Sequence, residues 1–267
     1  MAITKDKLLN PDIDAYLNPW LPRNRIDRLP APVRRFLGYR TAPYVEPPLA
    51  IQWCLAFLAS VAGICFVGGV FRNAPGISRY HPPALIASLG ASAVLDYNAI
   101  RSPLAQPRNA VIGNTLSSVC GVAISKAFQS CSTFQEITWV SGAFGCAIAS
   151  VAMGITGTVH PPGGATAVIA SVEPAVVAMG WIYVPLVLLA SVMMQFVALL
   201  FNNTLRQYPL WWWTAGEVGA CLTKSSSRHD EKARGNIEDL EAATRIPSCK
   251  TDRLVESCFI YYLHVAC

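Results

Sequence analysis

The sequence predicts an all-α membrane protein, a multi-pass helical bundle of five to six hydrophobic segments. Hydrophobic residues make up 53% of the chain and charged residues only 14%, which is unlike the composition of a soluble domain. The apolar residues are also gathered into long runs without charge, and each run comes close to the roughly 20 residues that a helix needs to cross a bilayer. A soluble protein would have to bury several helices that are apolar on every face.

A repeated triplet indicates how these segments are organised. His-Pro-Pro occurs at 81–83 and at 160–162, and the two copies open the uncharged stretches HPPALIASLGASAV and HPPGGATAVIASVEP. Each copy lies between two long apolar stretches, so we expect two related halves of three segments each. With three segments per half, the second half has the opposite orientation to the first. This is the inverted repeat found in many transporters.

Residues 1–48 form a polar, proline-rich lead-in to the first segment. Arginines crowd into it, with Asp27 and Glu46 as the local opposing charges. The arginines are Arg23, Arg25, Arg28, Arg34, Arg35 and Arg40. The positive-inside rule therefore predicts an integral membrane protein with a cytoplasmic N-terminus. The first dozen residues lack an apolar core, so we expect the first membrane helix itself to direct insertion.

Six segments follow the lead-in within a predicted transmembrane domain, 49–213. They are 49–71, 82–96, 108–127, 137–158, 161–173 and 176–204. The second and fifth segments begin at the triplets and are short, since about fourteen helical residues cover only about 20 Å. We therefore expect two short or broken helices, each headed by His-Pro-Pro. Lipid cannot satisfy exposed backbone, so their irregular ends should be buried in protein or line a watery cavity.

The chain changes character after the last segment. Trp211, Trp212 and Trp213 suit the belt of aromatic residues at the interface between membrane and water. Residues 214–267 are mostly polar and charged, which is typical of a disordered tail.

The second triplet is the first candidate binding site. Proline is tolerated in the first turn of a helix, because the N–H groups there lack partners anyway, and glycine lets another group approach the backbone closely. Free N–H groups and the positive end of the helix dipole would then face a small anion. Alternatively, the prolines only end one helix and start the next, and the histidine bonds a backbone carbonyl. The candidate residues here are His160, Pro161, Pro162, Gly163, Gly164 and Thr166.

The second candidate group is SPLAQPRN, residues 102–109, just before the third segment. Arg108 is a fixed cation, and Gln106 and Asn109 are neutral hydrogen-bond donors. If this loop folds inward, it faces the second triplet from the same side of the membrane. A charged residue inside a membrane protein is a functional candidate. The alternative is an arginine at a helix end whose head reaches the interface.

Four stretches of the chain resemble the HPP family of integral membrane proteins, in its fungal branch. They are IASLGASAVL (86–95), SPLAQPRN (102–109), HPPGGATA (160–167) and ALLFNN (198–203). The resemblance extends over roughly residues 20–213. It places the signature positions of the family on the candidate residues above other than Thr166, and on Pro107. Plant members are linked to nitrite movement across the chloroplast envelope. The resemblance therefore implies a carrier of a small inorganic anion such as nitrite.

We accordingly expect a membrane transporter or channel for a small anion. The alternative is a non-transporting membrane scaffold whose tail recruits a partner. The nine cysteines show no metal-ligand spacing, and no catalytic motif or phosphate loop is evident, so we expect no enzyme, no catalytic residue, no cofactor and no metal site. The expected partners are the lipid bilayer and a small anion. Self-association of the chain is left open, and no nucleic acid is expected.

Overall fold

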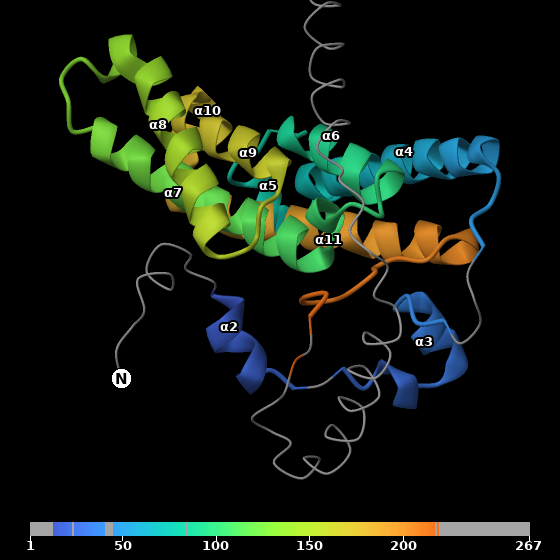
Figure 1. Ribbon diagram of the computed structural model, residues 1–267. Coiled ribbons are helices and arrows are strands. Elements are labelled where there is room, and N and C mark those ends of the chain that lie inside the picture. The colour runs from blue at the N-terminus through green and yellow to red at the C-terminus, as the bar shows by residue number, and fades with distance from the viewer. Residues whose placement is uncertain (1–12, 23, 41–44, 84, 217, 219–267) are drawn as a thin grey trace, which may run out of the picture. The chain divides into compact units, whose positions relative to one another are not determined.

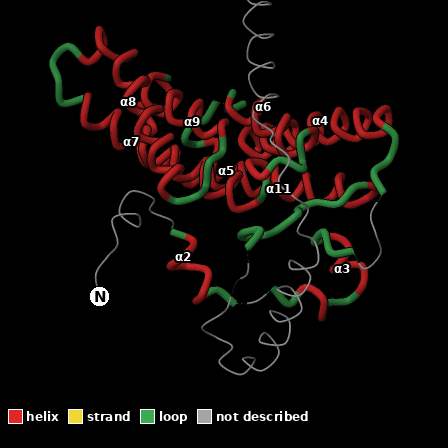
Figure 2. The backbone as a smooth tube through the Cα atoms, viewed as in Figure 1, coloured by secondary structure: helices red, strands yellow, loops and turns green. Residues whose placement is uncertain are grey.

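Four long helices account for the apolar runs of the sequence (Figure 1). The computed structural model describes residues 13–22, 24–40, 45–83, 85–216 and 218. Within these residues the long helices are α4 (Leu49–Asn73), α7 (Asn114–Phe128), α8 (Phe134–Ile155) and α11 (Tyr183–Leu205). With adjoining turns they give four candidate membrane spans, Leu49–Asn73, Asn109–Phe128, Phe134–Ile155 and Pro174–Leu205. No strand occurs in the described part of the chain (Figure 2). The predicted all-α, multi-pass fold is therefore confirmed.

Short helical turns connect and flank the long helices. In the lead-in they are α2 (Asp14–Leu17), η1 (Asn18–Trp20), η2 (Ile26–Arg28) and α3 (Ala31–Phe36). Between the long helices they are α5 (Pro75–Ser78), η4 (Pro103–Ala105), η5 (Asn109–Gly113), α10 (Pro174–Met179) and η6 (Gly180–Ile182).

Both short segments are helices, but the two triplets precede them differently. α9 (Pro161–Val172) begins directly after His160, as predicted. The helix after the first triplet, α6 (Ser88–Ala93), begins well beyond Pro82 and continues into the π-helical turn η3 (Val94–Asn98). His81 has a left-handed backbone with φ of 49°, whereas His160 has an extended backbone with φ of −140°.

Small residues hold α9 between α7 and α8. A Cβ on Gly121 of α7 would lie 2.5 Å from the carbonyl oxygen of Ala167 in α9, and a Cβ on Gly145 of α8 would lie 2.5 Å from the Ser171 Oγ. The Ser171 hydroxyl also lies 3.1 Å from the Gly121 carbonyl oxygen, to which it donates. A side chain at either glycine would separate the helices, which is the usual role of small residues between membrane helices.

The segment formed by α6 and η3 packs between α4 and α11. Gly63 of α4 leaves no room for a Cβ beside the Tyr97 side chain. The Tyr97 hydroxyl in turn donates to the Met194 carbonyl of α11 over 3.1 Å. Val67 and Phe71 complete a buried apolar contact along α4. The broken segment is therefore fixed on both sides.

Some helix pairs correspond under the exchange of halves that an inverted repeat would make. Exchange of the two halves maps α4 onto α8, α6 onto α9 and α7 onto α11. The observed pair of α4 with α11 then corresponds to the pair of α8 with α7, and α6 meets its own counterpart α9. The inverted repeat itself stays a prediction.

Arginines of the lead-in cap the C-terminal end of α11. Arg35 Nη2 donates to the Thr204 carbonyl over 2.9 Å, and Arg40 Nη2 donates to the carbonyls of Asn203 and Arg206 over 2.9 Å each. Carbonyls at a helix C-terminus lack partners within the helix and carry the negative end of its dipole, so guanidinium groups stabilise them. The lead-in therefore lies at the end of the bundle where α11 terminates. Residues 219–267 of the predicted tail lie outside the described residues.

Candidate functional site

His160 is fully buried at the start of α9, and both of its ring nitrogens have partners. Nδ1 lies 2.9 Å from the Leu104 carbonyl oxygen, and Nε2 lies 3.2 Å from the Ser92 Oγ of α6. A carbonyl only accepts, so Nδ1 donates to it. In the neutral imidazole, Nε2 then accepts from the Ser92 hydroxyl. His160 thus joins the loop before α7 to the broken segment.

Further hydrogen bonds continue from Ser92 into the bundle. Asn114 Nδ2 donates to Ser92 Oγ over 3.3 Å, and the Thr166 Oγ1 lies 3.2 Å from Asn114 Oδ1 and 2.8 Å from Ser88 Oγ. We call His160, Ser92, Asn114, Thr166 and Ser88 the polar seam. Each of them is at most 2% exposed. The seam is therefore a continuous row of uncharged polar side chains between α6, α7 and α9.

The first turn of α9 offers fewer free N–H groups than the sequence led us to expect. Pro161 and Pro162 have none, and the Gly163 N–H donates to the His160 carbonyl over 2.8 Å. Gly163 serves close packing, because a Cβ there would lie 2.5 Å from the Ser117 Oγ of α7. A Cβ on Gly164 would lie 3.4 Å from the Cys146 Sγ, which is ordinary contact. The side chains beside this turn are therefore further candidate donors.

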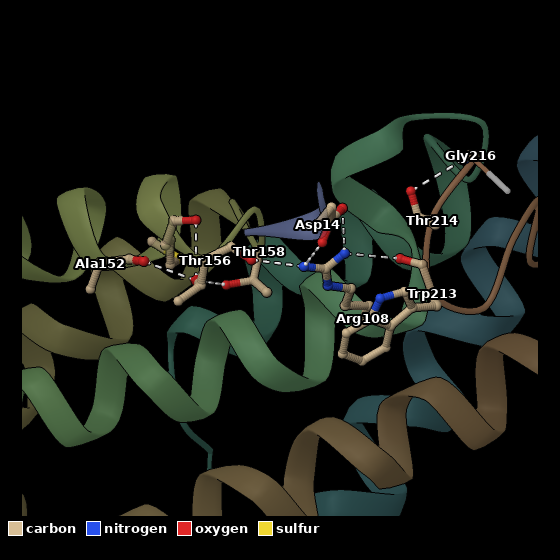
Figure 3. Close-up of polar contacts among 9 residues, drawn as sticks. Asp14, Arg108, Ala152, Thr156, Thr158, Trp213, Thr214 and Gly216 are labelled. Carbon is tan, nitrogen blue, oxygen red and sulfur yellow. Dashed lines mark hydrogen bonds and ion pairs between the residues drawn. The ribbon is translucent and has the colours of Figure 1, made fainter. Parts of the chain in front are cut away.

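Arg108 lies beside the turn that precedes α9 (Figure 3). Its Nη1 donates to Asp14 Oδ2 over 2.8 Å, and its Nη2 lies 2.7 Å from Asp14 Oδ1. Nη2 also donates to the Thr156 carbonyl over 2.8 Å, and the guanidinium carbon lies 4.3 Å from the centre of the Trp213 ring. Arg108 is 5% exposed, and its Nε has no hydrogen-bond partner. A buried guanidinium thus holds a carboxylate through both terminal nitrogens.

The other two candidates of this loop fix its backbone. Gln106 Nε2 donates to the carbonyls of Ile100 and Ser102 over 3.1 and 2.9 Å, while its Oε1 accepts from the Leu210 N–H over 2.8 Å. Asn109 Nδ2 donates to the Val159 carbonyl over 2.9 Å. The loop is therefore tied both to itself and to the turn before His160.

The two candidate groups meet in space, at the turn formed by residues 156–160. Leu104, Arg108 and Asn109 each contact this turn through the bonds given above. His81 is exposed and takes no part. Sequence reasoning missed Asp14, Ser88, Ser92 and Asn114. In the sequence, Ser88 and Ser92 form an i, i+4 pair in IASLGASAVL, and Asn114 is an amide inside an apolar run. Neither pattern indicates which residue the side chain bonds.

Comparison with known proteins gives one family. The model of "HPP, transmembrane region" matches residues 46–209. A curated transmembrane protein of Dictyostelium discoideum is 33% identical over 203 residues, which covers 74% of this chain and 63% of that protein. A second transmembrane protein of the same organism is 41% identical over 133 residues, 48% of this chain and 42% of that protein. The chain therefore spans less than two thirds of the length of these relatives. No solved structure matches.

Proposed function

We propose that this chain, which belongs to the HPP transmembrane region family, carries a small inorganic anion across a membrane, with nitrite as the first substrate to test. The polar seam is the observation that supports this proposal most. Its side chains are buried between the helices of the bundle, and polar groups at such positions are costly and commonly functional. Ser, Thr, Asn and His side chains can each offer an O–H or N–H group, which is what an anion needs in place of water.

Arg108 supports the choice of an anion over a cation. Hydroxyl and amide oxygens can also hold a cation, so the seam alone does not decide the sign of the charge. A buried guanidinium beside the end of the seam attracts anions and repels cations. The Asp14 carboxylate already occupies its two terminal nitrogens. Nitrite, like a carboxylate, has two oxygens on one atom, so it could take the place of Asp14.

Transport would need the seam to open. All five of its side chains are sealed from solvent in this conformation. The proposed inverted repeat offers a route, because one half of such a bundle can rock against the other around a central site. We place the Arg108 end on the cytoplasmic side, since the arginine-rich lead-in lies there and basic segments are retained in the cytoplasm. We also propose that the protein moves its substrate without chemical change. The scaffold alternative depends on the tail, residues 214–267. The structure describes only residues 214–216 and 218 of it.

Nitrite uptake into liposomes containing the purified full chain tests this function. We expect uptake above that of empty liposomes, and a large loss in His160→Ala but not in His81→Ala, the exposed histidine of the first triplet. Arg108→Gln should likewise lose uptake, while Arg72→Gln, at an exposed helix end, should keep it. Folded protein that takes up neither nitrite nor nitrate would contradict the function. Normal uptake by His160→Ala and Arg108→Gln would contradict the site.

A further inference from the structure

A carboxyl group that the polar seam does not use lies inside the bundle. Asp96 is 1% exposed and belongs to η3, where the broken segment changes from an α-helix to a π-helical turn. Its backbone carbonyl accepts from Asn202 Nδ2 of α11 over 2.9 Å. Its side-chain Oδ1 has no hydrogen-bond partner. Such a group in a membrane protein is expensive to keep ionised, and it commonly marks a proton or ion pathway.

Unused polar atoms of α11 lie on the same side as Asp96. The Gln195 side chain lies near the Asp96 carboxyl; its Oε1 accepts from the Tyr208 hydroxyl, and its Nε2 lacks a hydrogen-bond partner. Ser191 comes one helical turn earlier and Tyr183 two turns before that, so the i, i+4 spacing puts all three on one face. The Ser191 and Tyr183 hydroxyls are also buried without a partner. A stripe of unpaired polar atoms thus runs from Asp96 toward the start of α11.

The groups around Asp96 favour a proton over a metal ion. The phenol of Tyr97 donates to the Met194 carbonyl, and the guanidinium of Arg206 donates to the carbonyls of Tyr97 and Asn98. Burial raises the pKa of the Tyr208 phenol well above its usual value, so this group stays neutral. α4 contributes Gly63, beside the Tyr97 side chain. A metal cation would require several oxygen ligands, commonly including carboxylates.

We propose that Asp96 is an intramembrane proton-binding site, served by Gln195 and the polar stripe of α11, and that its protonation accompanies movement of the anion. One proton passes from hydronium on one side of the membrane to one carboxylate oxygen, and from there to water on the other side, so O–H bonds are the only bonds made and broken. A proton and a monovalent anion moving together carry no net charge. The coupling depends on the proposed anion transport, whereas the binding of the proton does not.

Infrared spectroscopy of the full chain in lipid tests the proton site without any transport. A protonated carboxyl has a C=O stretch that moves when H₂O is replaced by D₂O. We expect such a band, its loss in Asp96→Asn and its return in Asp96→Glu. Gln195→Met, of similar shape, should shift the band because it removes the amide beside the carboxyl. The proton site is refuted if the wild-type protein shows no protonated carboxyl band at any pH of a titration. It is also refuted if neither Asp96→Asn removes the band nor Gln195→Met shifts it.

Nitrite uptake under an imposed proton gradient tests the coupling. Inward proton gradients should stimulate uptake by the wild-type protein and by Asp96→Glu, while Asp96→Asn should lose this stimulation. Uptake that is normal in size but indifferent to the gradient would overturn the coupling and leave the anion transport intact. Stimulation by a sodium gradient that depends on Asp96 would overturn the proton as the ligand. If no variant takes up nitrite but the infrared band behaves as expected, only the proposed function fails.

Discussion

Replacing Gly121 by alanine should push α9 away from α7. The new Cβ would lie 2.5 Å from the Ala167 carbonyl oxygen and 2.7 Å from the Ala170 Cβ, both on α9. Ordinary van der Waals contact begins at 3.4 Å, so the closest approach falls short by about 0.9 Å. The carbonyl is part of a helix backbone and cannot rotate away as a side-chain end can. α9 must therefore shift as a unit, which disturbs the hydrogen bonds of Thr166 to the rest of the seam.

The energetic effect can be isolated with a matched glycine. Overpacking of this kind costs about 1–3 kcal/mol, while the better helix propensity of alanine returns up to about 1 kcal/mol. Gly69 of α4 has no atom within 4 Å of its added Cβ, so Gly69→Ala carries only the second effect. We expect Gly121→Ala to be less stable than Gly69→Ala by about 1–3 kcal/mol, the overpacking cost alone.

Unfolding by SDS, followed through the helical circular dichroism of the purified full chain in mixed micelles, measures this difference. Nitrite uptake by the same two variants should fall for Gly121→Ala and stay normal for Gly69→Ala. Equal unfolding free energies would refute the close contact between α7 and α9. A large loss of stability without any loss of uptake would refute the link between the position of α9 and the seam.

Three further substitutions test single contacts. Arg108→Lys keeps the charge but loses the two-pronged contact, so the nitrite concentration for half-maximal uptake should rise about tenfold, the equivalent of about 1.4 kcal/mol. Arg72→Lys is the control and should leave this concentration unchanged. An unchanged value for Arg108→Lys would exclude direct binding of nitrite by Arg108. Asp14→Asn removes the carboxylate that occupies Arg108 and should lower that concentration, and an increase would show that Asp14 supports binding instead. Tyr208→Phe removes the hydroxyl that lies 2.6 Å from the Ala105 carbonyl oxygen and 2.5 Å from Gln195 Oε1, and should lower the free energy of SDS unfolding by about 1–3 kcal/mol. Tyr80→Phe, on the exposed Tyr80, is its control, and equal stability of the two variants would contradict a stabilising role of the Tyr208 hydroxyl.

Local patterns were enough to predict the spans and the start of α9. Charge-free runs of sufficient length mark the four long helices, and His160 followed by two prolines and two glycines marks a helix start. The later start of α6 was not predictable in the same way. The triplet is identical in both places, yet His81 has a left-handed backbone and His160 an extended one, a difference that the shared triplet does not reveal.

The partners of the site residues could not be predicted, because they come from distant parts of the chain. Ser92 bonds His160 across 68 positions, and Asp14 bonds Arg108 across 94. Such pairs depend on how α6 and the lead-in pack, and a single sequence carries no signal for that packing. The expected anion site at the start of α9 stays a prediction. Prolines remove two of its N–H groups, so the hydroxyl, amide and imidazole groups of the polar seam are further candidate donors.

Thr166→Val is the most direct test of the idea that the polar seam conducts the anion. Valine has nearly the shape of threonine but lacks the hydroxyl that contacts Ser88 and Asn114. Thr138→Val is the matched control, because the Thr138 hydroxyl bonds the Phe134 carbonyl of its own helix over 2.8 Å. In liposomes with equal amounts of folded protein, we expect nitrite uptake to fall about tenfold or more for Thr166→Val, as the loss of about 1.4 kcal/mol of stabilisation predicts, and to stay unchanged for Thr138→Val. Wild-type uptake by Thr166→Val would contradict the account.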